Sequence, residues 1–218
     1  MSVRKINFVE GEYFHIYNRG NSKQKIFHDK QDYLYFLLIL FISNNVNNFD
    51  LNNFSKKENA FNVKRSKEIV AIGAYCLMPN HFHVLITQIE DGGISKFMQK
   101  LSTAYAMYYN KKYKRTGSLF EGKFKAEHVD TDVYLKYIFS YIHLNPIKLI
   151  YPKWKKEGIT NKKEALHYLD SYEYSSYRDF LGKDRKYKNI INIKPFPQYF
   201  SKKNSFQKEI MDWINYGE

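Results

Sequence analysis

The stretch that decides the fold class is Met78-Pro79-Asn80-His81-Phe82-His83-Val84-Leu85-Ile86. Its first three residues have turn chemistry, and they separate two segments of strand length, 69–77 and 81–87, which predicts a β-hairpin. Alternate side chains of a strand share a face, so His81 and His83 should project together while the residues between them face a core. Two neighbouring imidazoles can hold a metal ion, although two ordinary hydrogen-bonded histidines also fit this pattern taken alone.

Further elements surround this hairpin in a regular order. We predict strands at Tyr13–Asn18 and Phe124–Val129, and helices at Asp29–Phe41, Ile94–Lys112 and Thr131–Asn145. Asp29 is the expected N-cap of the first helix. Pro146 is expected to end the third helix, because the residue before a proline disfavours helical backbone. The order strand, helix, strand, strand, helix, strand, helix predicts an α+β fold, with helices packed on a small, largely antiparallel sheet.

Two parts of the chain carry weaker patterns. Residues 43–68 are rich in Asn, Lys and Ser and have no sustained period, which predicts a surface loop or flexible insertion. We expect residues 1–150 to form one domain that includes this insertion. Residues 151–218 are expected to form a C-terminal extension of loops and helical fragments, near Lys162–Leu169 and Phe206–Tyr216.

Composition narrows the class of protein. The 218 residues include 35 Lys and Arg against 22 Asp and Glu, a formal net charge of +13, and 18% are aromatic. Cations neutralise phosphates and rings stack on unpaired bases, so this composition favours a nucleic-acid partner, although lysine-rich, AT-biased codon usage also contributes. The one cysteine, Cys76, is expected to be a small buried residue, and the chain is expected to be cytoplasmic. No targeting segment is visible, and the longest apolar run, Tyr33–Ile42, is about half of what crosses a bilayer, so no membrane partner is expected.

The third predicted helix carries a second polar group. Tyr141 and Asn145 are four residues apart and therefore share a helical face, so the Tyr141 hydroxyl could lie beside a metal ion whose shell the Asn145 amide completes. A core tyrosine and a capping asparagine explain the same two residues. The chain has 20 tyrosines, so chemistry alone does not select Tyr141. The tyrosines of the preceding helix are expected to be core or interface residues: Tyr105, Tyr108 and Tyr109.

Four segments, in order along the chain, resemble the single-tyrosine HUH transposases, in which U is a bulky apolar residue and corresponds here to Phe82. They are Phe14-His15-Ile16-Tyr17-Asn18-Arg19-Gly20, the strand segment Met78–Ile86, Arg115-Thr116-Gly117-Ser118-Leu119-Phe120-Glu121-Gly122-Lys123-Phe124-Lys125, and Tyr141-Ile142-His143-Leu144-Asn145-Pro146. A later segment, Tyr174-Ser175-Ser176-Tyr177, is similar to a further family segment that usually has Trp at the position of Tyr174. Together these segments resemble the repeat-associated (REP-associated) tyrosine transposase branch.

The resemblance implies a fold and a set of active-site residues. The fold is that of the HUH endonucleases, a ferredoxin-like antiparallel sheet flanked by helices. His81 and His83 match the histidine pair that binds a divalent metal ion. Tyr141 matches the nucleophile, and Asn145 matches the polar residue that completes the metal shell. The implied ion is Mg²⁺ or Mn²⁺, and two imidazoles with an amide suit Mn²⁺ better.

The activity that the resemblance implies is the nicking and rejoining of single-stranded DNA, next to a hairpin, through a 5′-phosphotyrosine link. Such a link stores the phosphodiester energy, so no nucleotide cofactor is expected, and no Walker-type glycine motif is present. Cationic residues of the family-like segments are the expected DNA contacts: Arg19, Arg115, Lys123 and Lys125. The sequence leaves open whether the protein is a monomer or a homodimer in which each tyrosine helix serves the partner's site.

Three other functions stay compatible with the sequence. A nickase for replication or plasmid transfer (a relaxase) uses the same chemistry, but such proteins usually carry a third metal-binding histidine or further domains, which are not evident here. A catalytically inactive, domesticated module could bind hairpin DNA or RNA without cutting it, although the presence of His81, His83, Tyr141 and Asn145 argues against decay. A zinc-dependent hydrolase is the weakest alternative, since no H-E-x-x-H motif or carboxylate cluster supports it.

Overall fold

A four-stranded antiparallel sheet forms the centre of the molecule. The computed structural model describes residues 6–47, 61, 63 and 65–215. The strands are β1 (Tyr13–Arg19), β2 (Val70–Met78), β3 (His81–Gln88) and β4 (Lys125–Val129). They lie in the order β2-β3-β1-β4, and each neighbouring pair is antiparallel. The predicted hairpin and the predicted strands on either side of it are confirmed.

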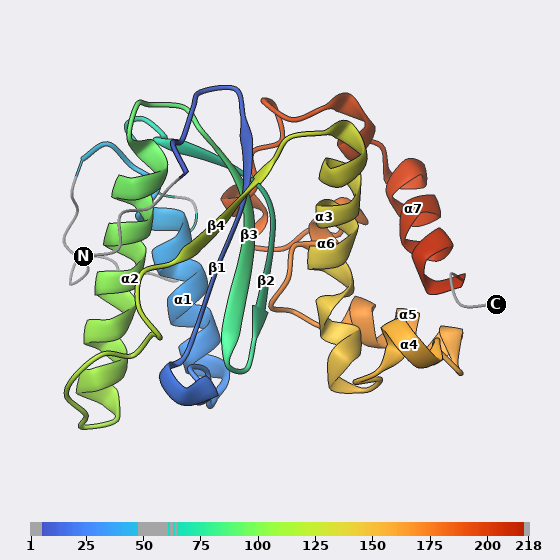
Figure 1. Ribbon diagram of the computed structural model, residues 1–218, viewed down its shortest axis with the longest axis horizontal. Helices are drawn as coiled ribbons and strands as arrows, with labels where there is room; N and C mark the ends of the chain where they lie inside the picture. The colour runs from blue at the N-terminus through green and yellow to red at the C-terminus, as the bar shows by residue number, and fades with distance from the viewer. Residues whose placement is uncertain (1–5, 48–60, 62, 64, 216–218) are drawn as a thin grey trace.

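Helices α1 (Lys30–Ile42) and α2 (Gly93–Lys112) cover one face of the sheet (Figure 1). Asp29 caps α1 as predicted, because its carboxylate accepts from the backbone N–H of Asp32 while the Asp32 side chain accepts from the Asp29 backbone. Strand, helix, strand, strand, helix, strand, with this sheet order, is the ferredoxin-like arrangement. The predicted α+β fold class is therefore confirmed.

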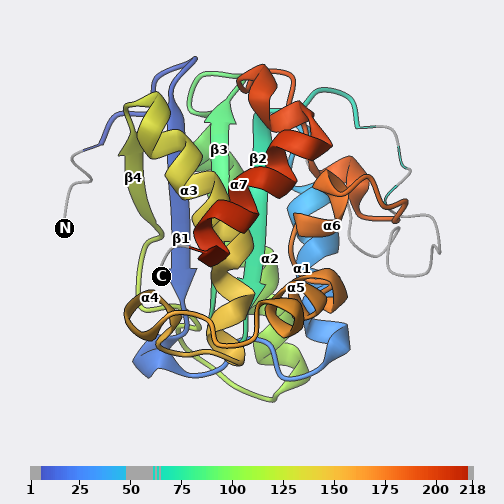
Figure 2. The same ribbon diagram turned by 90° about the vertical axis from the view of Figure 1, so that its right-hand side faces the viewer.

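The other face of the sheet is covered by α3 (Asp132–Leu144), which lies across the strands beneath α7 (Lys203–Asn215) (Figure 2). Pro146 ends the α-helix as predicted, but the backbone stays helical. The chain continues directly as a 3₁₀ turn, η4 (Asn145–Leu149), with Pro146 in its first turn. A proline fits there because the first N–H groups of a helical segment need no intrahelical acceptor.

Side-chain alternation along the strands creates two separate hydrophobic cores. Phe82 and Ile86 of β3 pack with α1 and α2, whereas Leu85 packs with α3. The predicted alternation is thus confirmed, and His81 and His83 share the α3 side with Leu85.

The C-terminal residues continue the core on the α3 side. Besides α7, the helices are α4 (Trp154–Glu157), α5 (Lys162–Ser171) and α6 (Tyr177–Phe180), with 3₁₀ turns η1 (Asn21–Lys23), η5 (Lys188–Ile190) and η6 (Gln198–Ser201) elsewhere in the chain. Leu169 and Phe206 belong to the same buried cluster as α3, and segment 174–176 hydrogen-bonds to Tyr75 and Leu77 at the outer edge of β2. The predicted helical fragments became α5 and α7, whereas α4 and α6 are too short to leave a period in the sequence. In the part of the chain that the structure describes, no helix combines the length and apolar character that crossing a bilayer needs.

Most of the predicted insertion, 43–68, lies outside the described residues. Its beginning is firmly packed, because Asn44 is fully buried. The Asn44 amide oxygen accepts from the backbone N–H groups of Ile69 and Val70 at 3.0 Å, and its nitrogen donates to the Val70 carbonyl at 2.9 Å. The start of this segment is therefore tied to β2.

Candidate active site

His81 and His83 lie side by side at the start of β3. Their ring centres are 4.9 Å apart and their planes are nearly perpendicular, at 88°. His83 is 7% exposed and His81 is half-buried. Burial lowers the pKa of His81 to about 4, with smaller contributions from Lys148 and Arg19. Burial also holds the pKa of His83 well below its ordinary value, with smaller contributions from His15, His81 and Lys148. Both imidazoles are therefore neutral near pH 7, which is the form that binds a metal ion.

Tyr141 reaches the same place from α3. Its ring centre lies 5.5 Å from that of His83, with the planes at 76°. Tyr141, His81 and His83 line one cavity of about 280 Å³. Because α3 packs on β2 and β3 of its own chain, a single chain brings the predicted nucleophile to the predicted histidine pair.

Two lysines surround the Tyr141 phenol. Lys148 Nζ donates to the hydroxyl oxygen at 3.1 Å, and Lys155 Nζ lies 4.4 Å from the ring centre. Burial raises the pKa of Tyr141, and the charge of Lys155 opposes that rise. Burial and the nearby charge of Lys155 lower the pKa of Lys148. Neither lysine was predicted from the sequence, although Lys148 had a usable signal: seven residues after Tyr141, a helical chain returns to the same face.

Asn145 is fully buried at the end of α3. Its side-chain nitrogen donates to the Tyr141 carbonyl at 2.9 Å, which is the four-residue spacing that the sequence indicated. Its side-chain oxygen accepts from Lys148 at 3.0 Å. The role of Asn145 as a metal ligand stays a prediction, and it requires Lys148 to release this oxygen.

A second layer of polar groups, from β1, β4 and α3, stands behind His83. His83 Nδ1 lies 2.9 Å from His15 Nε2, and His15 Nδ1 lies 3.5 Å from Glu127 Oε2. Glu127 also accepts hydrogen bonds from the hydroxyls of Tyr17, at 2.8 Å, and Tyr134, at 3.1 Å. No role was predicted for any of these residues from the sequence. His15 and Tyr17 had a signal, since they share one strand face inside a family-like segment, whereas Glu127 belongs to no motif.

The histidine pair fits a divalent metal ion. The Nδ1 atom of each ring is already engaged, that of His83 by His15 and that of His81 by Asn80 Oδ1 at 2.6 Å, which leaves Nε2 for a ligand. Within the described residues, no group of three or more His, Cys, Asp or Glu side chains could hold a metal ion. The two imidazoles therefore suit an ion that takes its other ligands from amide, water or phosphate oxygens, as Mg²⁺ and Mn²⁺ do, better than a structural zinc.

The four cationic residues predicted to contact DNA separate into two groups. Arg19 and Lys125 line the cavity of the histidines, and Arg19 Nε forms an ion pair with Glu121 at 2.6 Å. Lys123 lines a different hollow, and Arg115 follows α2 in the loop beyond its end. The structure thus brings Arg19 and Lys125 to the candidate site and leaves Lys123 and Arg115 outside it. Contact of any of the four with DNA stays a prediction.

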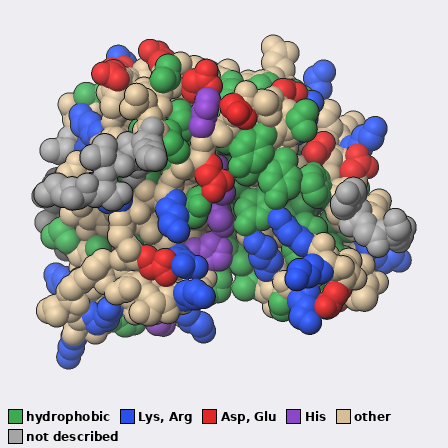
Figure 3. All heavy atoms as spheres, viewed as in Figure 1, with side chains coloured by type: hydrophobic (Ala, Val, Ile, Leu, Met, Phe, Trp, Pro, Cys, Tyr) green, Lys and Arg blue, Asp and Glu red, His purple; other side chains and the backbone are tan. Residues whose placement is uncertain are grey.

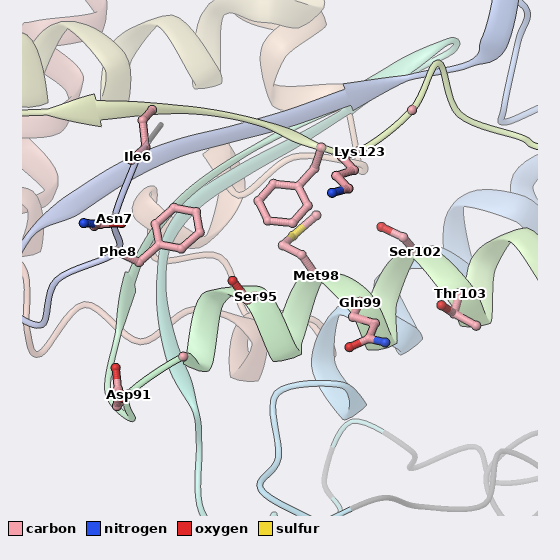
Figure 4. Close-up of a pocket in the computed structure, with 13 residues that line it drawn as sticks. Ile6, Asn7, Phe8, Asp91, Ser95, Met98, Gln99, Ser102, Thr103 and Lys123 are labelled. Atoms are coloured by element: carbon pink, nitrogen blue, oxygen red, sulfur yellow. The ribbon is translucent and has the colours of Figure 1, made fainter. Parts of the chain in front are cut away.

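A larger hollow, of about 780 Å³, lies between α2 and the segment 122–124 (Figure 4). Ser102 and Thr103 of α2 project from one side of it and Lys123 stands on the other (Figure 4). None of its described lining residues is a histidine or a tyrosine. Size therefore does not identify the candidate site, because the predicted histidine pair and tyrosine line the smaller cavity.

The surface around the smaller cavity suits an anionic substrate. Figure 3 shows histidine side chains in a hollow near the middle of one face, with Lys and Arg side chains on both sides. Cations at the rim of a cavity raise the local concentration of phosphate groups. The electrostatics of this face therefore agree with a nucleic-acid substrate.

The fold and the site together define a class of protein. A ferredoxin-like sheet with two histidines on a central strand, and a tyrosine on the helix above them, has the architecture of a single-tyrosine HUH nuclease. The chain belongs to the IS200-like transposase family, whose model ("Transposase IS200 like") matches residues 9–145, more than half of the chain. The matched range contains His81, His83, Tyr141 and Asn145. The family resemblance seen in the sequence is confirmed.

A solved structure shares the fold. It is a REP-associated tyrosine transposase bound to a REP hairpin, with a TM-score of 0.52 and 14% sequence identity, and the match covers 84% of this chain and 87% of that chain. At this identity the similarity establishes the common fold rather than the roles of residues. A comparison with curated proteins gave no match.

Proposed function

We propose that this protein nicks and rejoins single-stranded DNA, with Tyr141 as the nucleophile and with His81 and His83 as ligands of a divalent metal ion. One observation carries the proposal: a phenol in contact with a lysine ammonium shares a cavity with two neutral imidazoles, all within one chain. Membership of a transposase family supports the same class of chemistry.

The first chemical step is a displacement at a backbone phosphorus of the DNA. The Tyr141 phenol loses its proton and its oxygen bonds to phosphorus. The bond from phosphorus to the 3′ oxygen breaks, and the leaving oxygen takes up a proton. The products are a 5′-phosphotyrosine and a 3′-hydroxyl. Attack by another 3′-hydroxyl on this link rejoins the DNA and releases Tyr141, so no nucleotide cofactor is consumed.

The side chains around Tyr141 lower the barrier to this step. Burial disfavours the phenolate, so the ring needs a cation nearby to lose its proton. Lys148, at 3.1 Å from the oxygen, and Lys155, at 4.4 Å from the ring centre, supply that charge. When bound, the divalent ion polarises a nonbridging phosphate oxygen and offsets the charge of the pentavalent transition state. Arg19 and Lys125, at the cavity wall, hold neighbouring phosphates.

The proposed substrate is single-stranded DNA next to a hairpin. The solved relative is described as bound to a hairpin, and a formal net charge of +13 suits a ligand that combines a duplex stem with a single-stranded flank.

The proposal is tested by trapping the covalent intermediate. The protein is incubated with Mn²⁺ and labelled single-stranded oligonucleotides from the DNA that flanks its own gene, and denaturing gels detect a protein–DNA adduct. We expect an adduct with the wild type and none with Tyr141→Phe. Tyr137→Phe is the matched control, because that ring stacks 6.0 Å from Tyr141 on the preceding turn of α3, and its adduct should persist.

Two outcomes would redirect the assignment. An adduct that persists in Tyr141→Phe rules out Tyr141 as the nucleophile. Hairpin binding by the wild type without any adduct, on verified native flanking sequences, favours the inactive binding module instead.

A further inference from the structure

Three side chains form a line that ends at the inner side of His83. Glu127 Oε2 lies 3.5 Å from His15 Nδ1, and His15 Nε2 lies 2.9 Å from His83 Nδ1. The two imidazole rings are nearly parallel, at 21°, with centres 5.0 Å apart. The sheet register produces this alignment, because Glu127 is directly opposite His15 on the neighbouring strand and His83 is diagonal to it. His15 is 3% exposed, so solvent does not replace its contacts.

The line can be hydrogen-bonded in two directions. The 2.9 Å contact between His15 Nε2 and His83 Nδ1 holds one proton between two ring nitrogens, so one imidazole donates and the other accepts, and an uncharged imidazole carries its single proton on one nitrogen only. In one direction, His83 Nδ1–H donates to His15 Nε2, and His15 Nδ1–H points to Glu127. In the other, His15 Nε2–H donates to His83, and the bare His15 Nδ1 faces a carboxylate. Among the described residues His15 Nδ1 forms no hydrogen bond and faces Glu127 Oε2 at 3.5 Å, so the second direction leaves a buried lone pair against an anion.

Glu127 selects the first direction because it is held as a carboxylate. Burial acts to raise its pKa, but hydrogen bonds from Tyr17 and Tyr134 and the proximity of His15 hold that pKa below its ordinary value. Both hydroxyls donate to Glu127, and a phenol, whose ordinary pKa is about 10, keeps its proton near neutral pH. An ionised carboxylate has no proton to give, so it accepts from His15.

We propose that Glu127, acting through His15, keeps the ring proton of His83 on Nδ1 and so leaves His83 Nε2 as a bare donor for the metal ion. Glu127 and His15 are then positioning residues, and their value to the enzyme rests on the proposed metal role of His83. Carboxylate–histidine contacts behind a metal ligand fix its tautomer and raise its basicity. In this protein His15 lies between the carboxylate and the metal ligand, so Glu127 acts on His83 without contacting it. We call the line Glu127–His15–His83 the relay.

The tautomer of His83 tests this inference without metal or DNA. In metal-free protein labelled with ¹⁵N-histidine, the chemical shifts of the ring nitrogens separate protonated from bare atoms, and the His83 signals are assigned by their loss in His83→Asn. We expect the wild type to carry the His83 proton on Nδ1. In Glu127→Gln, the amide can donate to His15 Nδ1, which reverses the line and moves the His83 proton to Nε2.

A second readout is the affinity for Mn²⁺, measured by calorimetry or electron paramagnetic resonance. We expect Glu127→Gln to bind Mn²⁺ on the order of tenfold more weakly, as is usual when an outer partner of a ligand is lost. Glu12→Gln is the matched control, because Glu12 contacts His128, the next residue of β4, at 2.8 Å in an exposed pair that is not behind His83. This control should change neither the His83 tautomer nor the affinity. Circular dichroism verifies that both variants fold.

The outcomes separate this inference from the proposed function. A wild-type His83 with its proton on Nε2, or a proton that stays on Nδ1 in Glu127→Gln, overturns the inference. If the tautomers behave as expected and the wild type binds no Mn²⁺, the relay stands and the proposed metal role of the histidines fails.

Discussion

Helices α2 and α3 lie on opposite faces of the sheet (Figure 1). Each of them carries a row of tyrosines. On α2, the Tyr105 hydroxyl donates to the Ile26 carbonyl at 2.5 Å, and Tyr108 donates to the Asp32 carboxylate at 3.1 Å. On α3, the Tyr141 hydroxyl instead accepts from the Lys148 ammonium. An acceptor keeps a phenol protonated, whereas a cation favours the phenolate. The partner of the hydroxyl therefore distinguishes Tyr105 and Tyr108 from Tyr141, the proposed nucleophile. The Tyr137 hydroxyl also accepts from a lysine, Lys155, at 3.2 Å, but Tyr137 does not line the cavity of the histidines.

The lysines beside these two rows of tyrosines also differ in their contacts. Lys112, at the end of α2, lies 5.6 Å from the Tyr108 ring, but its ammonium is bound by the carboxylates of Asp29 and Asp32. Lys148 contacts a phenol and an amide, which are neutral groups. Its charge therefore acts on Tyr141 without being offset by a carboxylate in direct contact.

The strongest test of this comparison removes the hydroxyl of one tyrosine on each helix. Tyr141→Phe should abolish the DNA adduct and leave stability nearly unchanged. Tyr105→Phe should keep the adduct and lower the free energy of unfolding by about 1–2 kcal/mol, because the buried Ile26 carbonyl loses its donor. Denaturing gels measure the first effect and urea titration the second. A folded Tyr105→Phe protein that forms no adduct would contradict the division of roles.

The next largest effect concerns histidines, because a tyrosine of α2 also pairs with a histidine, which comes from the segment before α1. His28 Nε2 lies 2.8 Å from the Tyr109 hydroxyl, as His83 lies beside Tyr141. His83→Asn should lose Mn²⁺ binding and slow adduct formation on the order of 100-fold or more, and EDTA should have the same effect on the wild type, reversed by Mn²⁺. His28→Asn should change neither. Calorimetry and single-turnover gels provide the readouts, and Mn²⁺ binding that survives in His83→Asn would remove His83 from the metal site.

A smaller effect is expected from the lysines. Lys148→Met should slow adduct formation on the order of tenfold to 100-fold, because the phenolate loses its nearest cation. Loss of a cation raises the pKa of Tyr141, so the rate, which increases as the phenol deprotonates, should need a higher pH in the variant. Rates measured over a pH series test this, with Lys112→Met as the control that keeps the wild-type profile. Superimposable profiles for Lys148→Met and the wild type would show that Lys148 does not act on the phenol.

The smallest expected effect is on stability at the α2 side. Burial acts to raise the pKa of Asp32, but hydrogen bonds from Lys112, the His28 backbone and Tyr113 hold it below its ordinary value. A carboxyl whose pKa is lower in the folded than in the unfolded protein stabilises the folded state at a pH above its unfolded pKa. This stabilisation is lost as the pH falls through its folded pKa. Asp32→Asn should therefore cost about 2 kcal/mol near neutral pH, and much less in acid. Urea titrations of both proteins, near neutral pH and in acid, measure the difference in unfolding free energy between wild type and Asp32→Asn. A difference that is as large in acid as near neutral pH would show that the ion pair is irrelevant.

Much of the fold could be predicted because it follows from local patterns. The turn at 78–80 and the alternation after it fixed the hairpin and the shared face of His81 and His83, which the structure confirms. The N-cap at Asp29 was predicted for the same reason, and the structure adds that Asp32, three residues later, completes a capping box. The helices α4 and α6 were missed, because a single turn leaves no period to detect.

The candidate site could be predicted only in part. Tyr141 and the histidines were selected by the family-like segments, and the structure brings them to one cavity. His15 and Glu127 were missed, because their contact depends on the register between β1 and β4, whose paired residues are more than a hundred positions apart in sequence. Lys155 was missed because it approaches Tyr141 from another element.

The sequence by itself determined the class of fold and the residues that share a face, because periodicity and capping act between neighbours in the chain. It also indicated the family, through the resemblance of ordered segments. Only the tertiary structure decided that α3 covers the sheet of its own chain, that Lys148 meets the Tyr141 hydroxyl, and that Glu127 stands behind His83 through His15. These contacts arise from strand register and from the packing of distant elements into a common core, and no local pattern encodes either of them.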